Sequence, residues 1–269
     1  MATYVWKDLG LFTAVAFDPN ADVVDFSGSG LSAAQLLVGG DDDEGIAVLT
    51  SQRFVFLQID FPQRLHQTNF LNFADGSRVV IGDNTAARFD DDLGQTLTGS
   101  SGADFITGLG GSDSISAGGG NDSIWGFTGD EAWFGNDTID GGAGFDLLIL
   151  SPVGDDDSIV GSLATGSLQV GSVEGTLVLS NIEGLIGGDR ADSLVGSAAD
   201  NYLDGGGGND TVSGGAGNDT LRGGSGDDSI IGGAGNDEIR GNAGRDTMAG
   251  GLGDDVYIGV RGSDLITEN

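Results

Sequence analysis

Thirteen aspartates in this chain recur at a spacing that could build metal sites. Each is the sixth residue of a nine-residue unit that approximates G-G-x-G-x-D-x-U-x, where U is a large apolar residue. Nine such units follow one another from Gly187 to Thr267 without a break, and Asn201 takes the place of the aspartate in the second of them. A shorter array begins at Gly99 and ends at Ile149, and one of its units is longer than the rest.

The two halves of a unit favour different local structures. The glycine-rich half suits a tight turn, and the apolar half suits a short strand with one inward side chain. Two units then make one coil, so the turns alternate between two edges and every second aspartate stacks on the same edge. The expected stacks are Asp192, Asp210, Asp228, Asp246 and Asp264 on one edge, Asn201, Asp219, Asp237 and Asp255 on the other, and Asp104, Asp122 and Asp146 opposite Asp113 and Asp137 in the shorter array. The expected inward residues of the longer array are Leu194, Leu203, Val212, Leu221, Ile230, Ile239, Met248, Tyr257 and Ile266.

Stacked carboxylates require a cation. Neighbouring strands lie about 4.8 Å apart, and unscreened carboxylates at that spacing repel each other. Ca²⁺ accepts about six to eight oxygen ligands and tolerates a mixture of carboxylates and carbonyls. One ion between neighbouring turns of the same edge would remove the repulsion. Same-edge neighbours give up to about ten candidate calcium sites, with the site that uses Asn201 the weakest because Asn brings no charge.

The charge balance limits the possible partners. The chain has 42 acidic and 10 basic residues, for a net charge of −32, which argues against nucleic acid and anionic membranes as partners. It contains no cysteine, so disulfides and thiolate chemistry are excluded, and no apolar stretch is long enough to insert into a membrane. Its 52 glycines also fit a disordered linker, but a linker does not place an apolar residue at every ninth position. We expect disorder before calcium and folding upon calcium binding.

Residue composition and the repeat register divide the chain into four segments. Residues 1–90 are expected to form a β-rich N-terminal cap, residues 91–149 the first array, and residues 187–269 the second array. Residues 150–186 leave the nonapeptide register. They fit either a flexible linker or irregular wider coils of one continuous rod, and the persistence of strand patterning favours the coils.

From about residue 90 onward, these repeats resemble the RTX (repeats-in-toxin) family of hemolysin-type calcium-binding proteins. The resemblance implies an all-β parallel β-roll, a right-handed β-solenoid, and export by a type I secretion system. It also implies Ca²⁺ held by the position-six aspartate and by the carbonyls of positions two and four. In this chain those carbonyls belong to Gly206, Gly208, Gly215, Gly217, Gly224, Gly226, Gly233, Gly235, Gly251 and Gly253. Arg190 and Ala199 replace the position-four glycine, so the first two turns of the longer array are expected to be empty. The stretch from Asn181 to Gly184 resembles a recurrent RTX lead-in.

No catalytic constellation is visible in the sequence. His66 is the only histidine, and neither G-x-S-x-G nor H-E-x-x-H occurs. We therefore expect a protein that is not an enzyme. The expected function is a secreted, extracellular or cell-surface bacterial calcium-binding module, acting as a scaffold or adhesion segment. Its expected partners are calcium ions, the type I secretion machinery and a cell-surface or protein partner. The alternative is the non-catalytic calcium-binding tail of a secreted hydrolase, and the context of the full gene would separate the two.

Overall fold

The computed structural model describes residues 94–108, 111–125, 136–150, 158–171 and 176–267 in full, together with the backbone of eight strands before residue 94. Every regular element within these ranges is a strand. The eight early strands are β1 (Thr3–Val5), β2 (Thr13–Phe17), β3 (Val23–Phe26), β4 (Leu37–Gly39), β5 (Ile46–Leu49), β6 (Phe54–Ile59), β7 (Thr68–Phe73) and β8 (Arg78–Ile81). Four of them, β2, β6, β5 and β4, form a small sheet of their own, and β8 pairs with the first coil of the repeats through β10.

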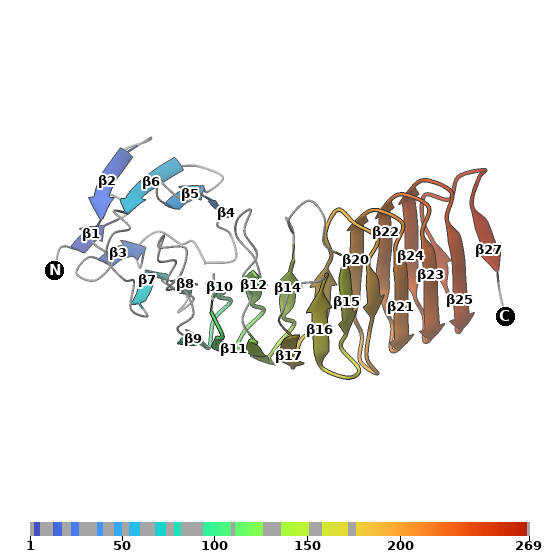
Figure 1. Ribbon diagram of the computed structural model, residues 1–269, viewed down its shortest axis with the longest axis horizontal. Helices are drawn as coiled ribbons and strands as arrows, with labels where there is room; N and C mark the ends of the chain where they lie inside the picture. The colour runs from blue at the N-terminus through green and yellow to red at the C-terminus, as the bar shows by residue number, and fades with distance from the viewer. Residues whose placement is uncertain are drawn as a thin grey trace.

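Two long sheets make up the repeat region (Figure 1). The first runs in the order β1-β3-β7-β8-β10-β12-β14-β18-β20-β22-β24-β26, and the second in the order β27-β25-β23-β21-β19-β15-β16-β17-β13-β11-β9. The strands from β9 onward are β9 (Thr96–Ser100), β10 (Phe105–Thr107), β11 (Ser114–Gly119), β12 (Ser123–Trp125), β13 (Thr138–Ala143), β14 (Leu147–Ile149), β15 (Ile159–Ser162), β16 (Ser167–Val170), β17 (Thr176–Ser180), β18 (Gly184–Ile186), β19 (Ser193–Val195), β20 (Tyr202–Gly207), β21 (Thr211–Ala216), β22 (Thr220–Ser225), β23 (Ser229–Ala234), β24 (Glu238–Ala243), β25 (Thr247–Leu252), β26 (Val256–Tyr257) and β27 (Leu265–Thr267). Consecutive repeat strands alternate between the sheets, so the all-β parallel roll expected from the sequence is confirmed.

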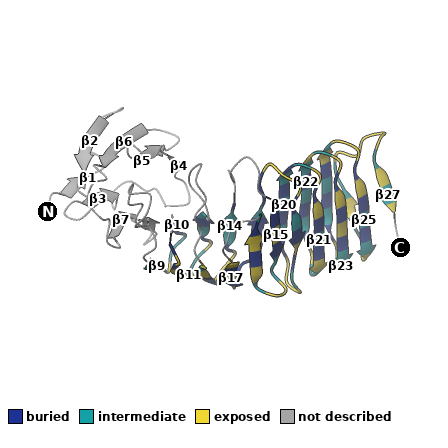
Figure 2. Ribbon diagram, viewed as in Figure 1, coloured by how far each residue is buried: buried dark blue, intermediate teal, exposed yellow. Residues whose placement is uncertain are grey.

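In the longer array the core is a stack of one buried apolar side chain per strand. Residues 18 apart lie in register, as Leu203 does with Leu221 on one sheet and Val212 with Ile230 on the other. The predicted inward residues from Leu194 to Met248 are all fully buried, and Tyr257 and Ile266 pack partly buried against this core. Figure 2 shows buried and exposed residues alternating along the strands, as a period of two requires. The predicted inward positions are therefore confirmed.

The segment between the arrays adds three strands to one sheet and one strand, β18, to the other. Strands β15, β16 and β17 pair in antiparallel fashion with one another, while β17 pairs in parallel with β13 and β15 in parallel with β19. On the other sheet β14 pairs directly with β18, and β18 with β20. Strand pairing thus crosses this segment on both sheets. β16 runs antiparallel to β15 and β17, so the segment departs locally from the parallel pairing of the arrays. The exact limits of the four predicted segments stay a prediction.

Candidate calcium sites

The glycine-rich half of each unit forms the turn at the edge of the roll. Positions two and four have positive φ in most turns, for example 116° at Gly224 and 129° at Gly226. At Gly226 a Cβ would also collide with the carbonyl of Gly208, which belongs to the neighbouring turn of the same edge. Glycine is therefore required there both by the backbone conformation and by the close approach of two turns. This packing brings the carbonyls of one turn against the backbone of the next.

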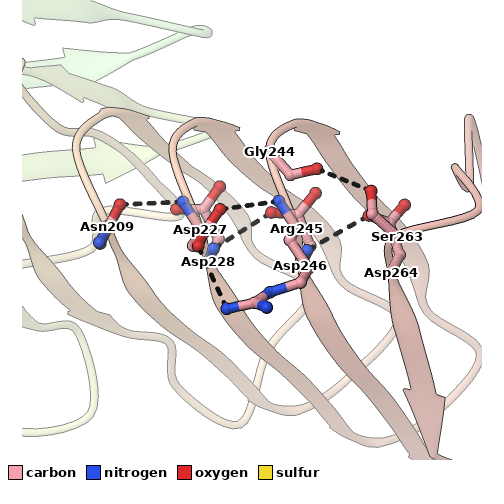
Figure 3. Close-up of polar contacts among 8 residues, drawn as sticks. All are labelled: Asn209, Asp227, Asp228, Gly244, Arg245, Asp246, Ser263 and Asp264. Atoms are coloured by element: carbon pink, nitrogen blue, oxygen red, sulfur yellow. Dashed lines mark hydrogen bonds and ion pairs between the residues drawn. The ribbon is translucent and has the colours of Figure 1, made fainter.

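The position-six aspartates form two hydrogen-bonded ladders, one along each edge. The Asp228 Oδ1 accepts the Asp210 N–H at 2.9 Å, and the Asp246 Oδ1 accepts the Asp228 N–H at 3.1 Å. Figure 3 shows this ladder continuing to Asp264, whose Oδ1 accepts the Asp246 N–H at 3.2 Å. The predicted stacking of aspartates on alternate edges is confirmed by these contacts.

The opposite edge and the shorter array repeat the arrangement. There the same bond joins Asp104 to Asp122, Asp122 to Asp146, Asp113 to Asp137, Asn201 to Asp219, Asp219 to Asp237, and Asp237 to Asp255. Each lower residue donates its backbone N–H to the Oδ1 of the higher one. All thirteen predicted aspartates therefore take part in a ladder, and Asp192 joins through the Oδ1 of Asp210.

The second carboxylate oxygen distinguishes seven of these aspartates. In seven of them the Oδ2 is buried and has no hydrogen-bond partner: Asp122, Asp146, Asp210, Asp219, Asp228, Asp237 and Asp246. The Oδ2 of Asp210 lies over Gly205, the first residue of its own turn, beside the carbonyl oxygen of Gly223 from the next turn on that edge. Asp219 and Asp237 have the same surroundings. A buried carboxylate oxygen without a partner is costly, and a second oxygen beside it makes an environment suited to a cation.

In three other turns a side-chain oxygen of the position-six residue accepts a hydrogen bond from the backbone of its own turn. The Asp192 Oδ2 accepts the Gly188 N–H at 2.8 Å, the Asn201 Oδ1 accepts the Ser197 N–H at 2.6 Å, and the Asp104 Oδ2 accepts the Ser100 N–H. In each case the donor is position two of the same turn. None of these three donors has a positive φ, unlike the glycines at position two of the turns around Asp210 and Asp219. The orientation of the position-two peptide therefore decides whether the side-chain oxygen is left unpaired.

Burial also disturbs the ionisation of these carboxyls. Desolvation, opposed by the backbone hydrogen bond and assisted by neighbouring carboxylates, raises the pKa of Asp122 and Asp210 to about 7. The same causes raise the pKa of Asp219 and Asp228 to about 6. Burial likewise raises the pKa of Asp137, Asp146, Asp192, Asp237 and Asp246. In the last unit of the second array, the hydrogen bond from the Arg261 N–H instead lowers the pKa of Asp264. A divalent cation beside the raised carboxyls would favour their charged form.

The donor set at these edges fits Ca²⁺. No three side chains of His, Cys, Asp or Glu gather at one point in the described ranges, so a cation held there would also need backbone carbonyls as ligands. Calcium accepts that mixture of oxygens and a flexible geometry, whereas zinc prefers nitrogen and sulfur. The predicted carbonyls of positions two and four lie in the same turns. Their assignment as ligands, like that of the aspartates, stays a prediction. His66 lies outside the described residues.

Two features of the edges were not anticipated from the sequence. Position five forms an outer ladder: the Asn209 Oδ1 accepts the Asp227 N–H at 2.9 Å, and the Asp227 Oδ1 accepts the Arg245 N–H at 2.9 Å (Figure 3). The frequent Asn or Asp at position five of the units was the available signal. The second feature is Glu183, whose Oε2 accepts the Asp146 N–H at 2.9 Å. Glu183 therefore extends the position-six ladder of the first array beyond Asp146, in the direction of Asn201.

The described part of the chain contains no helix with the length and apolar character needed to cross a membrane. A comparison with curated proteins found no match. The family model of the RTX calcium-binding nonapeptide repeat (4 copies) matches residues 92–130, 131–149, 186–221, 222–257 and 232–266. These ranges together cover just over half of the chain and coincide with the coils that carry the aspartate ladders. The chain therefore belongs to the RTX family of calcium-binding nonapeptide repeat proteins and is a calcium-binding β-roll module.

Proposed function

We propose that this β-roll is a secreted module whose folding is driven by calcium outside the cell, and that the folded rod then serves as a scaffold or adhesion segment. The observation that carries the proposal is the set of seven buried Oδ2 atoms without partners. Without a cation, each is a destabilising feature of the folded state. With calcium bound, the same atoms become ligands, so binding and folding are one event.

The charge of the chain supports the same order of events. A net charge of −32 opposes compaction of the metal-free polypeptide by self-repulsion. Each bound Ca²⁺ adds two positive charges and removes part of that repulsion. Where calcium is scarce, as in a cytosol, the chain stays expanded and able to thread a narrow export channel. Outside the cell, calcium folds it, and the folded rod does not pass back.

The proposed ligands are the position-six aspartates with an unpaired Oδ2 and the predicted glycine carbonyls of positions two and four. The position-one carbonyl that lies beside the Oδ2, as that of Gly223 does beside Asp210, is a further candidate. The turns of Asp104, Asp192 and Asn201 supply no unpaired oxygen, and we expect weak or no calcium binding between them and the next turn on their edge. For Asp192 and Asn201 this agrees with the expectation from Arg190 and Ala199. The physical reason is the position-two N–H, which occupies the side-chain oxygen that would otherwise face the ion.

Calcium titration of the purified chain tests the proposal. Far-ultraviolet circular dichroism and small-angle scattering are recorded in excess chelator and then with increasing Ca²⁺. We expect an expanded chain with little β-signal in chelator and a steep gain of β-structure and compactness with calcium. Mg²⁺ at the same concentrations is the control, because its octahedral preference and slow dehydration suit these sites poorly. An equal β-signal with and without chelator would exclude calcium-driven folding.

The expectation that this chain has no catalytic activity is tested separately. The calcium-loaded protein is screened against peptide, ester, phosphoester and polysaccharide substrates, and we expect no turnover. Turnover that is lost on replacing one acidic residue or His66 would contradict the scaffold proposal. The scaffold role itself predicts that removing calcium converts the rigid rod into an expanded, flexible chain, which scattering also measures.

A further inference from the structure

Glu183 occupies the place of a position-six aspartate although it lies outside the repeats. It directly precedes β18, just as Asp146 precedes β14 and Asn201 precedes β20. Strand pairing puts Gly184 beside Leu147 on one side and beside Tyr202 on the other. Glu183 is therefore the next rung after Asp146 on that edge. None of the ranges matched by the repeat family includes it.

The turn that carries Glu183 is shorter than a repeat turn. Ser180 pairs with Asp140, so Asn181 stands beside Gly141, which is position one of its unit. Ile182 alone then replaces positions two to five, and its side chain is buried in the core. Because the turn is shorter, we expect the Glu183 backbone to lie farther than usual from the Asp146 N–H that its side chain must reach. The additional methylene of Glu compensates, since its Oε2 still reaches the Asp146 N–H at 2.9 Å.

The space between these two rungs contains the same oxygen atoms as the gaps within the arrays. Asp146 is fully buried, and its Oδ2 has no hydrogen-bond partner. This Oδ2 and the Asn181 carbonyl oxygen both lie against the same face of Gly141. In the longer array, the Asp210 Oδ2 and the Gly223 carbonyl lie against Gly205 in the same way. The Asn181 side chain is engaged elsewhere, donating to the Asp140 Oδ1 at 2.7 Å, so its carbonyl is the atom that faces the gap.

We propose that Asp146, Asn181 and Glu183 form a calcium site that joins the two repeat arrays. The Asp146 Oδ2, the Asn181 carbonyl oxygen and the Glu183 carboxylate supply the protein ligands, and water completes the coordination shell. The proposal rests on the proposed calcium function of the ladders. An ion at this position makes the edge continuous from Asp122 to Glu183, so calcium binding in one array stabilises the coil that begins the other.

The shortened turn also predicts the character of the site. It lacks the carbonyls of positions two and four on the Glu183 side, so fewer protein oxygens reach the ion than between Asp210 and Asp228. The site is therefore expected to be weaker and more hydrated than those within the longer array. It is expected to fill after them as calcium is raised.

Glu183→Gln is the variant that tests the site. Gln retains an oxygen that can accept the Asp146 N–H, so the ladder bond is preserved while the charged ligand is lost. The matched control is Glu238→Gln, on the outer surface of the roll, where Glu238 pairs with Arg240 at 2.8 Å. Bound calcium per folded chain is counted by equilibrium dialysis and atomic emission. Affinities are measured by calorimetry.

We expect Glu183→Gln to bind one ion fewer than the wild type, or to bind one ion at least tenfold more weakly, while Glu238→Gln matches the wild type. Equal ion counts and affinities in all three proteins would refute the site and leave the calcium function of the ladders intact. An absence of bound calcium in the wild type would instead refute the proposed function.

Wild-type crystals grown in calcium provide a test that does not depend on the folding of a variant. Anomalous scattering should show a peak between the Asp146 Oδ2, the Asn181 carbonyl and the Glu183 carboxylate, in addition to peaks between Asp210 and Asp228. Peaks in the longer array without one at Glu183 would overturn the proposal.

Discussion

Replacing Asp228 with Asn should change the stability of the roll in opposite directions with and without calcium. Asp228 belongs to two gaps, because Asp210 precedes it and Asp246 follows it on the same edge. An Asn side chain retains the Oδ1 that accepts the Asp210 N–H. It replaces the buried, unpaired Oδ2 with an amide NH₂, which donates hydrogen bonds and cannot bind a cation.

In saturating calcium the substitution should be destabilising. If each of the two adjacent ions binds about tenfold more weakly, each loses about 1.4 kcal/mol of binding free energy. Since calcium binds the folded state, these losses appear in the free energy of unfolding, which should fall by about 3 kcal/mol in total.

Without calcium the sign reverses. The pKa of Asp228 rises from 3.8 to about 6 mainly through burial, so the ionised carboxylate disfavours the folded state at neutral pH. Removing that charge should stabilise the metal-free roll by at most about 3 kcal/mol, and by less where water screens the edge.

Asp192→Asn is the matched control. The Asp192 oxygens accept the Ile159 N–H at 2.7 Å and the Gly188 N–H at 2.8 Å, so both already have partners. An Asn there leaves one of these N–H groups facing an amide NH₂. The lost hydrogen bond, partly offset by removal of the buried charge, should change stability by the same amount with and without calcium.

Urea unfolding followed by circular dichroism measures both conditions, with an osmolyte added to populate the fold in chelator. Two outcomes would exclude the calcium role of Asp228: unchanged stability of Asp228→Asn in calcium, or a destabilisation of the metal-free roll as large as that of the calcium-loaded one. Either outcome would mean that the unpaired Oδ2 is not a calcium ligand.

Three further predictions follow from the edges. In chelator, acid should favour the fold: raised carboxyl pKa values mean that the stability present below pH 3.8 is lost as the pH rises through about 6 to 7, so β-signal should be greater near pH 4 than near pH 8. In calcium, protons compete for the same carboxylates, so calorimetry at falling pH should show weaker binding below about pH 7, and a constant affinity would contradict the assignment. Gly226→Ala should cost at least about 1–3 kcal/mol in urea unfolding because of its φ of 129° and the neighbouring Gly208 carbonyl, whereas Gly262→Ala, with open space around it, should change stability by less than about 0.5 kcal/mol. Equal effects of the two alanines would show that the close approach of the turns is not required.

The nonapeptide period by itself determined the stacking. A unit of nine residues with one turn and one strand puts every second unit on the same sheet, so the residue 18 positions away becomes the neighbour. This is why the inward residues from Leu194 to Met248 and the two aspartate ladders could be predicted from spacing alone. The same period identified the family that the repeat model then matched.

The tertiary structure decided which aspartates are left without a partner and what continues the ladder between the arrays. Asp192 and Asp210 have the same position in their units, yet one accepts a position-two N–H and the other does not, because the peptide at that position is oriented differently. Glu183 becomes a rung only because β18 pairs with β14, which brings together residues 37 apart in sequence. Periodicity specifies neighbours at a fixed separation, whereas peptide orientation and pairing across an irregular segment are set by the packing of the whole roll.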